Sequence, residues 1–231
     1  MRIQNERSTP ELISYQTLRA IVGALGMALP PVLYIWGQLL IPPEVAPSIS
    51  AYYDYRTRDA LVGALVAIGV FLFAYRGYGV WDQVVGKAAA LSSLGVAFFP
   101  VHGNSVEHAL HLGSAALMFI CLAVFSLVLF VQKDPSGRVT AQKIWRNRVY
   151  YLCGTAIVLS MVFIAALMLT VQGEVLEQNH SVLKLETVAL EAFGIAWFVK
   201  GEPLPFLRDK PTPGVSPGPS TSGSLQAPVA R

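Results

Sequence analysis

The chain of 231 residues is 54% hydrophobic and only 13% charged, with a formal net charge of +3. A soluble domain carries about 25% charged residues, so this composition excludes an ordinary water-soluble protein. It predicts an all-α, polytopic membrane protein whose principal partner is the lipid bilayer. The sequence shows no phosphate loop, dinucleotide fingerprint or nucleic-acid-binding pattern, so no nucleic acid partner is expected. Cys121 and Cys153 lie in apolar runs and are interpreted as packing residues.

Three regions follow one another along the chain. Residues 1–19 form a polar N-terminal segment, residues 20–200 a six-helix transmembrane domain, and residues 201–231 a disordered cytoplasmic tail rich in Pro, Gly and Ser. A spanning helix needs about 20 apolar residues. The second of six such spans ends near residue 75, and the others are expected at 20–43, 84–101, 108–131, 149–171 and 181–199.

Small residues and prolines give two further expectations for these spans. Pro30 and Pro31 should kink the first span, because proline removes a backbone donor and its ring clashes with the preceding turn. Gly23 with Gly26, and Gly63 with Ala67, are spaced to allow close helix packing.

Basic residues set the expected orientation. Six spans place both termini on one side, and 14 of the 17 Lys and Arg residues fall in segments on that side. Because basic loops stay in the cytoplasm, both termini are predicted to be cytoplasmic. The protein is therefore expected to be a multi-pass protein of the cell inner membrane.

The stretch 48–63, SISAYYDYRTRDALVG, places charged side chains directly before an apolar run on the expected outer side. A lone charge deep in a membrane helix costs about 2.5–3.5 kcal/mol on insertion scales, so such charges need a partner or a function. We expect Arg58 to pair with Glu186 in the last span, and Glu191 to lie nearer the middle of the membrane. The candidate outward-facing polar pocket comprises Asp54, Arg58, Asp59, His108, His111, Glu186 and Glu191.

His108 and His111 lie three residues apart on one expected helix face, where Asp59 of a neighbouring helix would complete a metal-ligand set. Zinc is the metal that such ligands would hold, with a bound water as the nucleophile. The competing interpretation is a pair of interfacial histidines that face water or cap polar groups. The sequence lacks the H-E-x-x-H motif of zinc hydrolases and the G-x-S-x-G motif of serine hydrolases.

Three functions remain open at this point. The first is binding or sensing of a lipid or small ligand at the outer leaflet by the polar pocket. The second is a membrane-embedded, metal-dependent lipid hydrolase that uses the same pocket. The third is a proton- or ion-coupled transporter with Glu191 as its midplane site, although the sequence shows no internal repeat of the kind that many transporters carry.

Three segments carry a resemblance: SISAYYDYRTRDALVGALVAIGVFLFAYRGY, RNRVYYLCG and LETVALEAFGIAWFVKGE. They resemble a family of uncharacterised bacterial six-span membrane proteins, over most of the chain from Ser48 to Glu202. The chain is also distantly similar to the DRAM/Sfk-type six-transmembrane group, which shares cytoplasmic termini and a polar outer loop before the second span. These resemblances imply a six-helix membrane fold and no particular reaction. A weaker similarity to membrane hydrolases of the ceramidase and progestin-receptor superfamily implies Ser, Asp and His chemistry, but this chain lacks their H-x-x-x-H pair.

Overall fold

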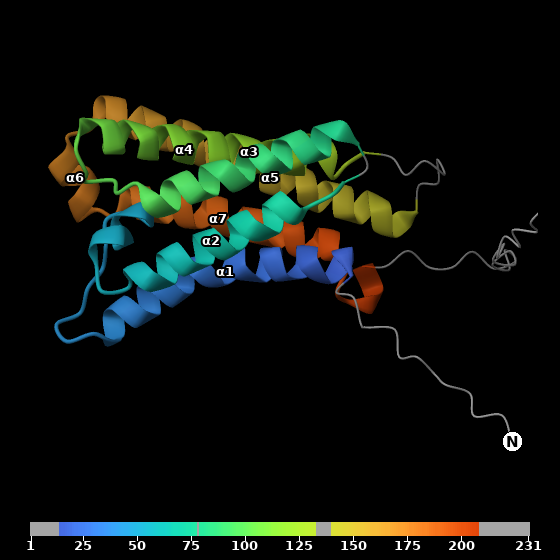
Figure 1. Ribbon diagram of the computed structural model, residues 1–231, viewed down its shortest axis with the longest axis horizontal. Helices are drawn as coiled ribbons and strands as arrows, with labels where there is room; N and C mark the ends of the chain where they lie inside the picture. The colour runs from blue at the N-terminus through green and yellow to red at the C-terminus, as the bar shows by residue number, and fades with distance from the viewer. Residues whose placement is uncertain (1–13, 78, 133–139, 208–231) are drawn as a thin grey trace, which may run out of the picture.

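The computed structural model describes residues 14–77, 79–132 and 140–207, and these residues contain helices but no β-strand (Figure 1). The all-helical prediction is therefore confirmed. Short 3₁₀ helices cover Ser50–Asp54 (η1) and Pro205–Leu207 (η3), and a π-helix covers Phe125–Leu129 (η2). The α-helices are α1 (Tyr15–Leu39), α2 (Arg58–Ala74), α3 (Val80–Phe98), α4 (Ser105–Val124), α5 (Ala141–Thr170), α6 (Gly173–Gln178) and α7 (Ser181–Gly201).

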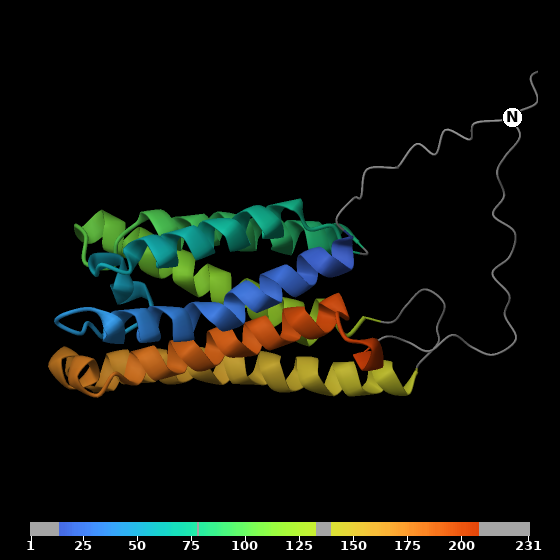
Figure 2. The same ribbon diagram turned by 90° about the horizontal axis from the view of Figure 1, so that it is seen from below.

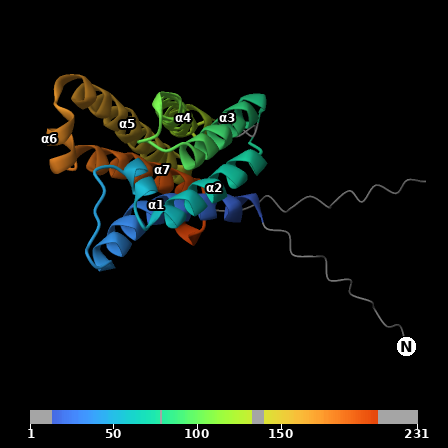
Figure 3. The same ribbon diagram turned by 60° about the vertical axis from the view of Figure 1, so that its left-hand side comes forward.

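The long helices form a closed ring. Each one packs against the next along the chain from α1 to α5, and α7 packs against both α5 and α1. Figure 3 shows α7 lying between α5 and α1, so the first and the last long helix of the described residues are neighbours. We call the end that holds η1 and α6 the connector end (left in Figure 1), and the opposite end, where α1 begins, the terminal end.

Many large apolar side chains face outwards from this ring. On α5, Leu152, Phe163 and Leu169 are all exposed, and Leu169 is 87% exposed. Three helical stretches among the described residues, Tyr15–Leu39, Ser105–Leu129 and Ala141–Thr170, are long and apolar enough to cross a membrane. An apolar surface of this kind is stable in lipid and costly in water. The protein is therefore embedded in a membrane.

Glycines close the contact between α1 and α7 at the terminal end, where Figure 2 shows the two helices side by side. A Cβ atom at Gly23 would lie 2.3 Å from the Phe198 backbone nitrogen, and one at Gly194 would lie 2.6 Å from the Met27 nitrogen. No side chain fits at such distances, so the backbones touch only because both residues are glycine. The close packing predicted at Gly23 is confirmed.

The predicted close contact at Gly63 is wrong. An added Cβ there would meet no heavy atom within 4 Å, because this part of α2 faces away from its neighbours. Pro30 and Pro31 both lie inside α1, which continues through them as one helix to Leu39.

An aromatic cluster fills the terminal end of the ring. Trp197 packs its ring edge-to-face against Tyr75, Phe125 and Phe130, with centroids 5.1, 5.1 and 5.2 Å apart. Such pairs each add about 0.5–1.5 kcal/mol beyond the burial of their surface. Phe130 directly follows the π-helix.

The ordered chain extends beyond the boundary expected at residue 200. Arg146 of α5 is 5% exposed and forms an ion pair of 2.7 Å with Glu202. Its guanidinium also donates to the carbonyl of Leu207, whose side chain is 2% exposed. These contacts hold residues 202–207 against α5, so the disordered tail cannot start at 201. Residues 208–231, and with them most of the predicted tail, lie outside the described residues.

A second boundary differs for a local reason. The helix expected from residue 108 begins at Ser105, because Asn104 caps it by accepting from the backbone nitrogens of Val106 and Glu107, each at 3.0 Å. The Glu107 carboxylate in turn accepts from the Asn104 nitrogen at 2.9 Å, which completes a capping box. Glu107 therefore has a structural role.

Gly23→Ala should destabilise the protein, since the new methyl group would collide with the α7 backbone. We expect a loss of about 1–3 kcal/mol in the free energy of unfolding, the usual cost of overpacking. Gly63→Ala is the matched control and should be neutral or slightly stabilising, because alanine favours helix by about 1 kcal/mol. Thermal melts in detergent measure both. Equal stability of the two variants would show that the α1–α7 backbone contact is wrong.

Candidate functional site

The predicted polar pocket is not a single site in the structure. Asp54 lies at the connector end, with Oδ2 2.6 Å from Nδ1 of His102. Asp59 is exposed in the first turn of α2. An acidic side chain at this position interacts favourably with the positive end of the helix dipole. His108 and His111 each place Nδ1 against a backbone carbonyl of the α3–α4 turn, at 2.6 and 2.7 Å.

The predicted ion pair between Arg58 and Glu186 is wrong. Arg58 donates to the Tyr53 hydroxyl at 2.6 Å, and its guanidinium carbon lies 4.1 Å from the centre of that ring. Glu186 instead accepts from the backbone nitrogen of Ile49 at 2.6 Å and from the Ser50 hydroxyl at 3.3 Å. Ile49 is the N-cap of η1, whose first N–H groups need acceptors, so a carboxylate satisfies them without a basic side chain.

Glu186 is part of a wider attachment between α7 and the α1–α2 connector, which we define as residues 40–57. The Leu183 nitrogen, near the start of α7, donates to the carbonyl of Pro47 at 3.0 Å. His180 Nδ1 lies 3.3 Å from the carbonyl of Ala46. These bonds and those of Glu186 fix the middle of the connector along one side of α7.

An ion pair and a hydrogen bond from Arg56 hold the two ends of the connector together. Arg56 Nε lies 2.8 Å from Glu44 Oε1, and the same guanidinium donates to the carbonyl of Pro42 at 3.1 Å. The hydrogen bond from Arg56 holds the pKa of Glu44 below its usual value. Burial raises the pKa of Tyr52, a connector residue that is 0% exposed. The connector is therefore a folded cap.

The predicted metal-ligand set of His108, His111 and Asp59 is not assembled. In the part of the chain that the structure describes, no group of three or more His, Cys, Asp and Glu side chains is placed to hold a metal ion. His111 is 1% exposed, and its Nε2 has no hydrogen-bond partner among the described residues. Its Nδ1 bond to the Phe99 carbonyl ties α4 to the end of α3, so His111 acts as a packing residue here.

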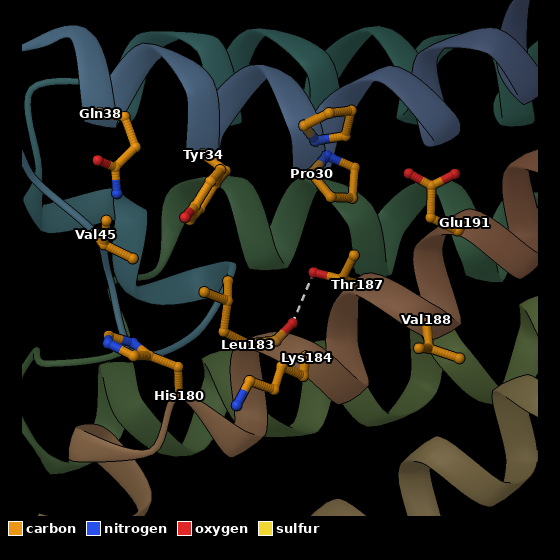
Figure 4. Close-up of a pocket in the computed structure, with 11 residues that line it drawn as sticks. Pro30, Tyr34, Gln38, Val45, His180, Leu183, Lys184, Thr187, Val188 and Glu191 are labelled. Carbon is orange, nitrogen blue, oxygen red and sulfur yellow. Dashed lines mark hydrogen bonds between the residues drawn. The ribbon is translucent and has the colours of Figure 1, made fainter.

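Only one of the predicted pocket residues, Glu191, lines the largest of the described cavities. This cavity, which we call the α1–α7 groove, has a volume of about 720 Å³ and lies between these two helices at their connector-end halves (Figure 4). It is lined by Pro30, Pro31, Tyr34, Gln38, Val45, His180, Leu183, Lys184, Thr187, Val188 and Glu191.

The sequence places these groove residues on one face of each helix. The α7 residues follow at intervals of three and four from His180 to Glu191, and those of α1 are spaced by four between Pro30 and Gln38. The groove starts where the glycine contact ends, because Gly194 lies three residues beyond Glu191 on α7. The spacing on α7 was visible in the sequence, but nothing there indicated that α1 would be the neighbour of α7.

Polar groups occupy the two ends of the groove. Figure 4 shows Gln38, His180 and Lys184 towards one end and the Glu191 carboxylate beside Pro30 at the other. Between these ends the Thr187 hydroxyl donates to the Leu183 carbonyl at 2.7 Å, so it is already satisfied. The Lys184 ammonium donates to the Asn179 carbonyl at 3.0 Å.

Comparison with known proteins adds no relative, since no family model, no curated protein and no solved structure matches the chain. The resemblance to six-span bacterial proteins and to the DRAM/Sfk-type group therefore stays a prediction.

Removal of the Glu186 carboxylate should loosen the connector. Glu186→Ala leaves the Ile49 N–H and the Ser50 hydroxyl without their acceptor, which should cost about 1–3 kcal/mol of unfolding free energy. Arg58→Ala should cost less than about 1 kcal/mol, since the hydrogen bond and the cation–π contact with Tyr53 that it removes are both exposed to solvent.

The double variant decides whether the two residues interact. Because Arg58 and Glu186 bind different partners, their effects should add to within about 0.5 kcal/mol. A double-mutant cycle from thermal or chemical unfolding in detergent measures this. A coupling energy above about 1 kcal/mol would restore the ion pair that we reject.

Proposed function

We propose that the protein is a six-span membrane protein that binds one drug-sized amphiphile in the α1–α7 groove, which the ligand enters from the outer leaflet. The observation that carries this proposal is the groove itself. Its volume of about 720 Å³ falls within the range of about 300–1,000 Å³ typical of small-molecule sites.

The lining of the groove supports an amphipathic ligand. Pro30, Val45, Leu183 and Val188 provide apolar walls between the polar ends. Burial of apolar ligand surface there would drive binding at about 25 cal/mol per Å² before the costs of association. The few polar groups would orient the ligand.

The groove is open at the side of the protein. Tyr34 and Val188 both line it, and both are 49% exposed on the surface of the helix ring. In the six-span arrangement this surface faces lipid, so a ligand could enter sideways without passing through water. Entry from the membrane suits a molecule that already partitions into the bilayer.

The orientation that we propose places the connector end outside and the terminal end in the cytoplasm of a bacterial cell. The first turns of α5 carry Lys143, Arg146 and Arg148 at the terminal end. This helix has 30 residues and would measure about 45 Å, against a hydrocarbon core of about 30 Å. Its basic start would therefore extend into the cytoplasm, as the positive-inside rule requires.

Among the three functions that the sequence left open, binding has the most support. The hydrolase alternative needs a catalytic ligand set, and the described residues bring none together. The transporter alternative needs a route beyond Glu191, whereas the glycine contact at Gly23 and Gly194 closes α1 against α7 on that side.

The proposed orientation is testable with reporter fusions. A reporter after Gly103, in the turn between α3 and α4, should report the outside, and a reporter after Leu207 should report the cytoplasm. Enzymatic reporters that are active on one side only, such as alkaline phosphatase and a fluorescent protein, give the readout. A cytoplasmic signal at Gly103 would overturn the six-span orientation.

The proposed ligand is testable by filling the groove. Val188→Trp should occupy the space beside Thr187 and abolish retention of a small molecule by the purified protein. Val70→Trp is the control, since Val70 is also an exposed valine on a helix and lines none of the described cavities. Native mass spectrometry of protein released from detergent should detect one bound small molecule in the parent and in Val70→Trp, but not in Val188→Trp. The same retention in all three proteins would contradict the proposal.

A further inference from the structure

The Glu191 carboxylate is the one acidic group that faces the α1–α7 groove, and it has no counter-charge among the described residues. It makes no hydrogen bond and no ion pair within the part of the chain that the structure describes. The nearest basic groove residue, Lys184, lies seven positions earlier on α7, about 10 Å along the helix. The ammonium of Lys184 is turned to the Asn179 carbonyl, towards the connector end.

The Glu191 carboxylate has one complementary chemistry. It offers only hydrogen-bond acceptors, and the groove residues Pro30 and Val188 close to it are apolar. A neutral ligand would leave the carboxylate without compensation in a lipid-surrounded groove, which is costly. A protonated amine supplies both the opposite charge and the N–H donors, and hydrogen bonds between charged groups are the strong ones.

We propose that the amphiphile bound in the groove is a hydrophobic amine whose ammonium group pairs with the Glu191 carboxylate. This inference rests on the proposed function, because it names the chemical class of the ligand for the same groove. The aromatic ring of Tyr34 lines the groove on the connector-end side of Pro30, where it offers an apolar face for the hydrocarbon part of the ligand (Figure 4).

The test compares two ligands of nearly equal size that differ in charge. The probes are tritiated nortriptyline, a tricyclic secondary amine that is protonated at neutral pH, and its neutral N-acetyl amide. Binding is measured to the full chain in phosphatidylcholine nanodiscs, with empty nanodiscs as the partition blank. The parent protein should bind the amine about 10- to 100-fold more tightly than the amide, the range expected for a hydrogen bond to a charged group.

Glu191→Gln keeps the size of the side chain and removes its charge. In this variant the affinity for the amine should fall to within about threefold of that for the amide, while the affinity for the amide stays unchanged and shows that the groove is intact. Glu174→Gln is the matched control, since it removes an exposed carboxylate on α6 outside the groove, and it should keep the full preference. If Glu191→Gln does not yield folded protein, Glu191→Ala takes its place with the same expected result.

The outcomes separate this inference from the proposed function. If Val188→Trp abolishes binding of both probes but Glu191→Gln keeps the preference for the amine, the groove binds amphiphiles and the role of Glu191 is wrong. An equal affinity of the parent for the two probes also overturns the inference. If neither probe binds saturably, or if Val188→Trp has no effect, the groove is not the site and both proposals fail.

Discussion

The backbone contact between α1 and α7 is the constraint on which the rest of the structure depends. These helices lie at opposite ends of the described chain, and their contact closes the helix ring. Gly23 and Gly194 let the backbones approach so closely that a methyl group would not fit at either position. In a membrane, where lipid is as apolar as the side chains, such close van der Waals packing is a main force between helices. Because the contact is confined to the terminal-end halves of both helices, the remaining halves can enclose a cavity. The groove therefore begins where α1 and α7 are no longer held together by the close contact at Gly23 and Gly194.

The connector then fixes the other end of the same helix pair. Residues 40–57 leave α1, and they are held to α7 by backbone groups of Pro47 and Ile49 and by the carboxylate of Glu186. Val45, just before this attachment, forms part of the groove wall. The groove thus has one end set by glycine packing and the other by a hydrogen-bonded cap. Its shape therefore depends on both of these contacts.

Much of the helical architecture could be predicted from the sequence. A long apolar segment in a membrane has to satisfy its own backbone hydrogen bonds, and an α-helix does so. The glycine spacing at Gly23 also indicated a packing surface, although the same pattern at Gly63 indicated one that does not exist. Local sequence does not say which helix lies opposite a small residue. The short elements were not predicted, since η1 and α6 depend on the connector and on the turn before α7. The candidate site was predicted poorly because local sequence does not show which groups meet in the fold. Glu186 was expected to pair with the oppositely charged Arg58, whereas in the structure it accepts a hydrogen bond from the backbone N–H of Ile49.

Glu186 and Glu191 show how one helix can use the same chemical group in two ways. They are five residues apart on α7, which rotates their side chains by about 140° relative to each other around the helix axis. Glu186 is directed to the connector, where the N–H of Ile49 and the hydroxyl of Ser50 compensate its charge. Glu191 is directed to the groove, where the described chain provides no such donor. A buried charge that the protein satisfies itself contributes to the fold, and replacing it changes stability. A charge that the protein leaves unsatisfied in a cavity costs free energy in the unliganded state, and that cost is recovered when a complementary ligand binds. The difference between the two carboxylates is therefore the physical reason to look for the ligand at Glu191.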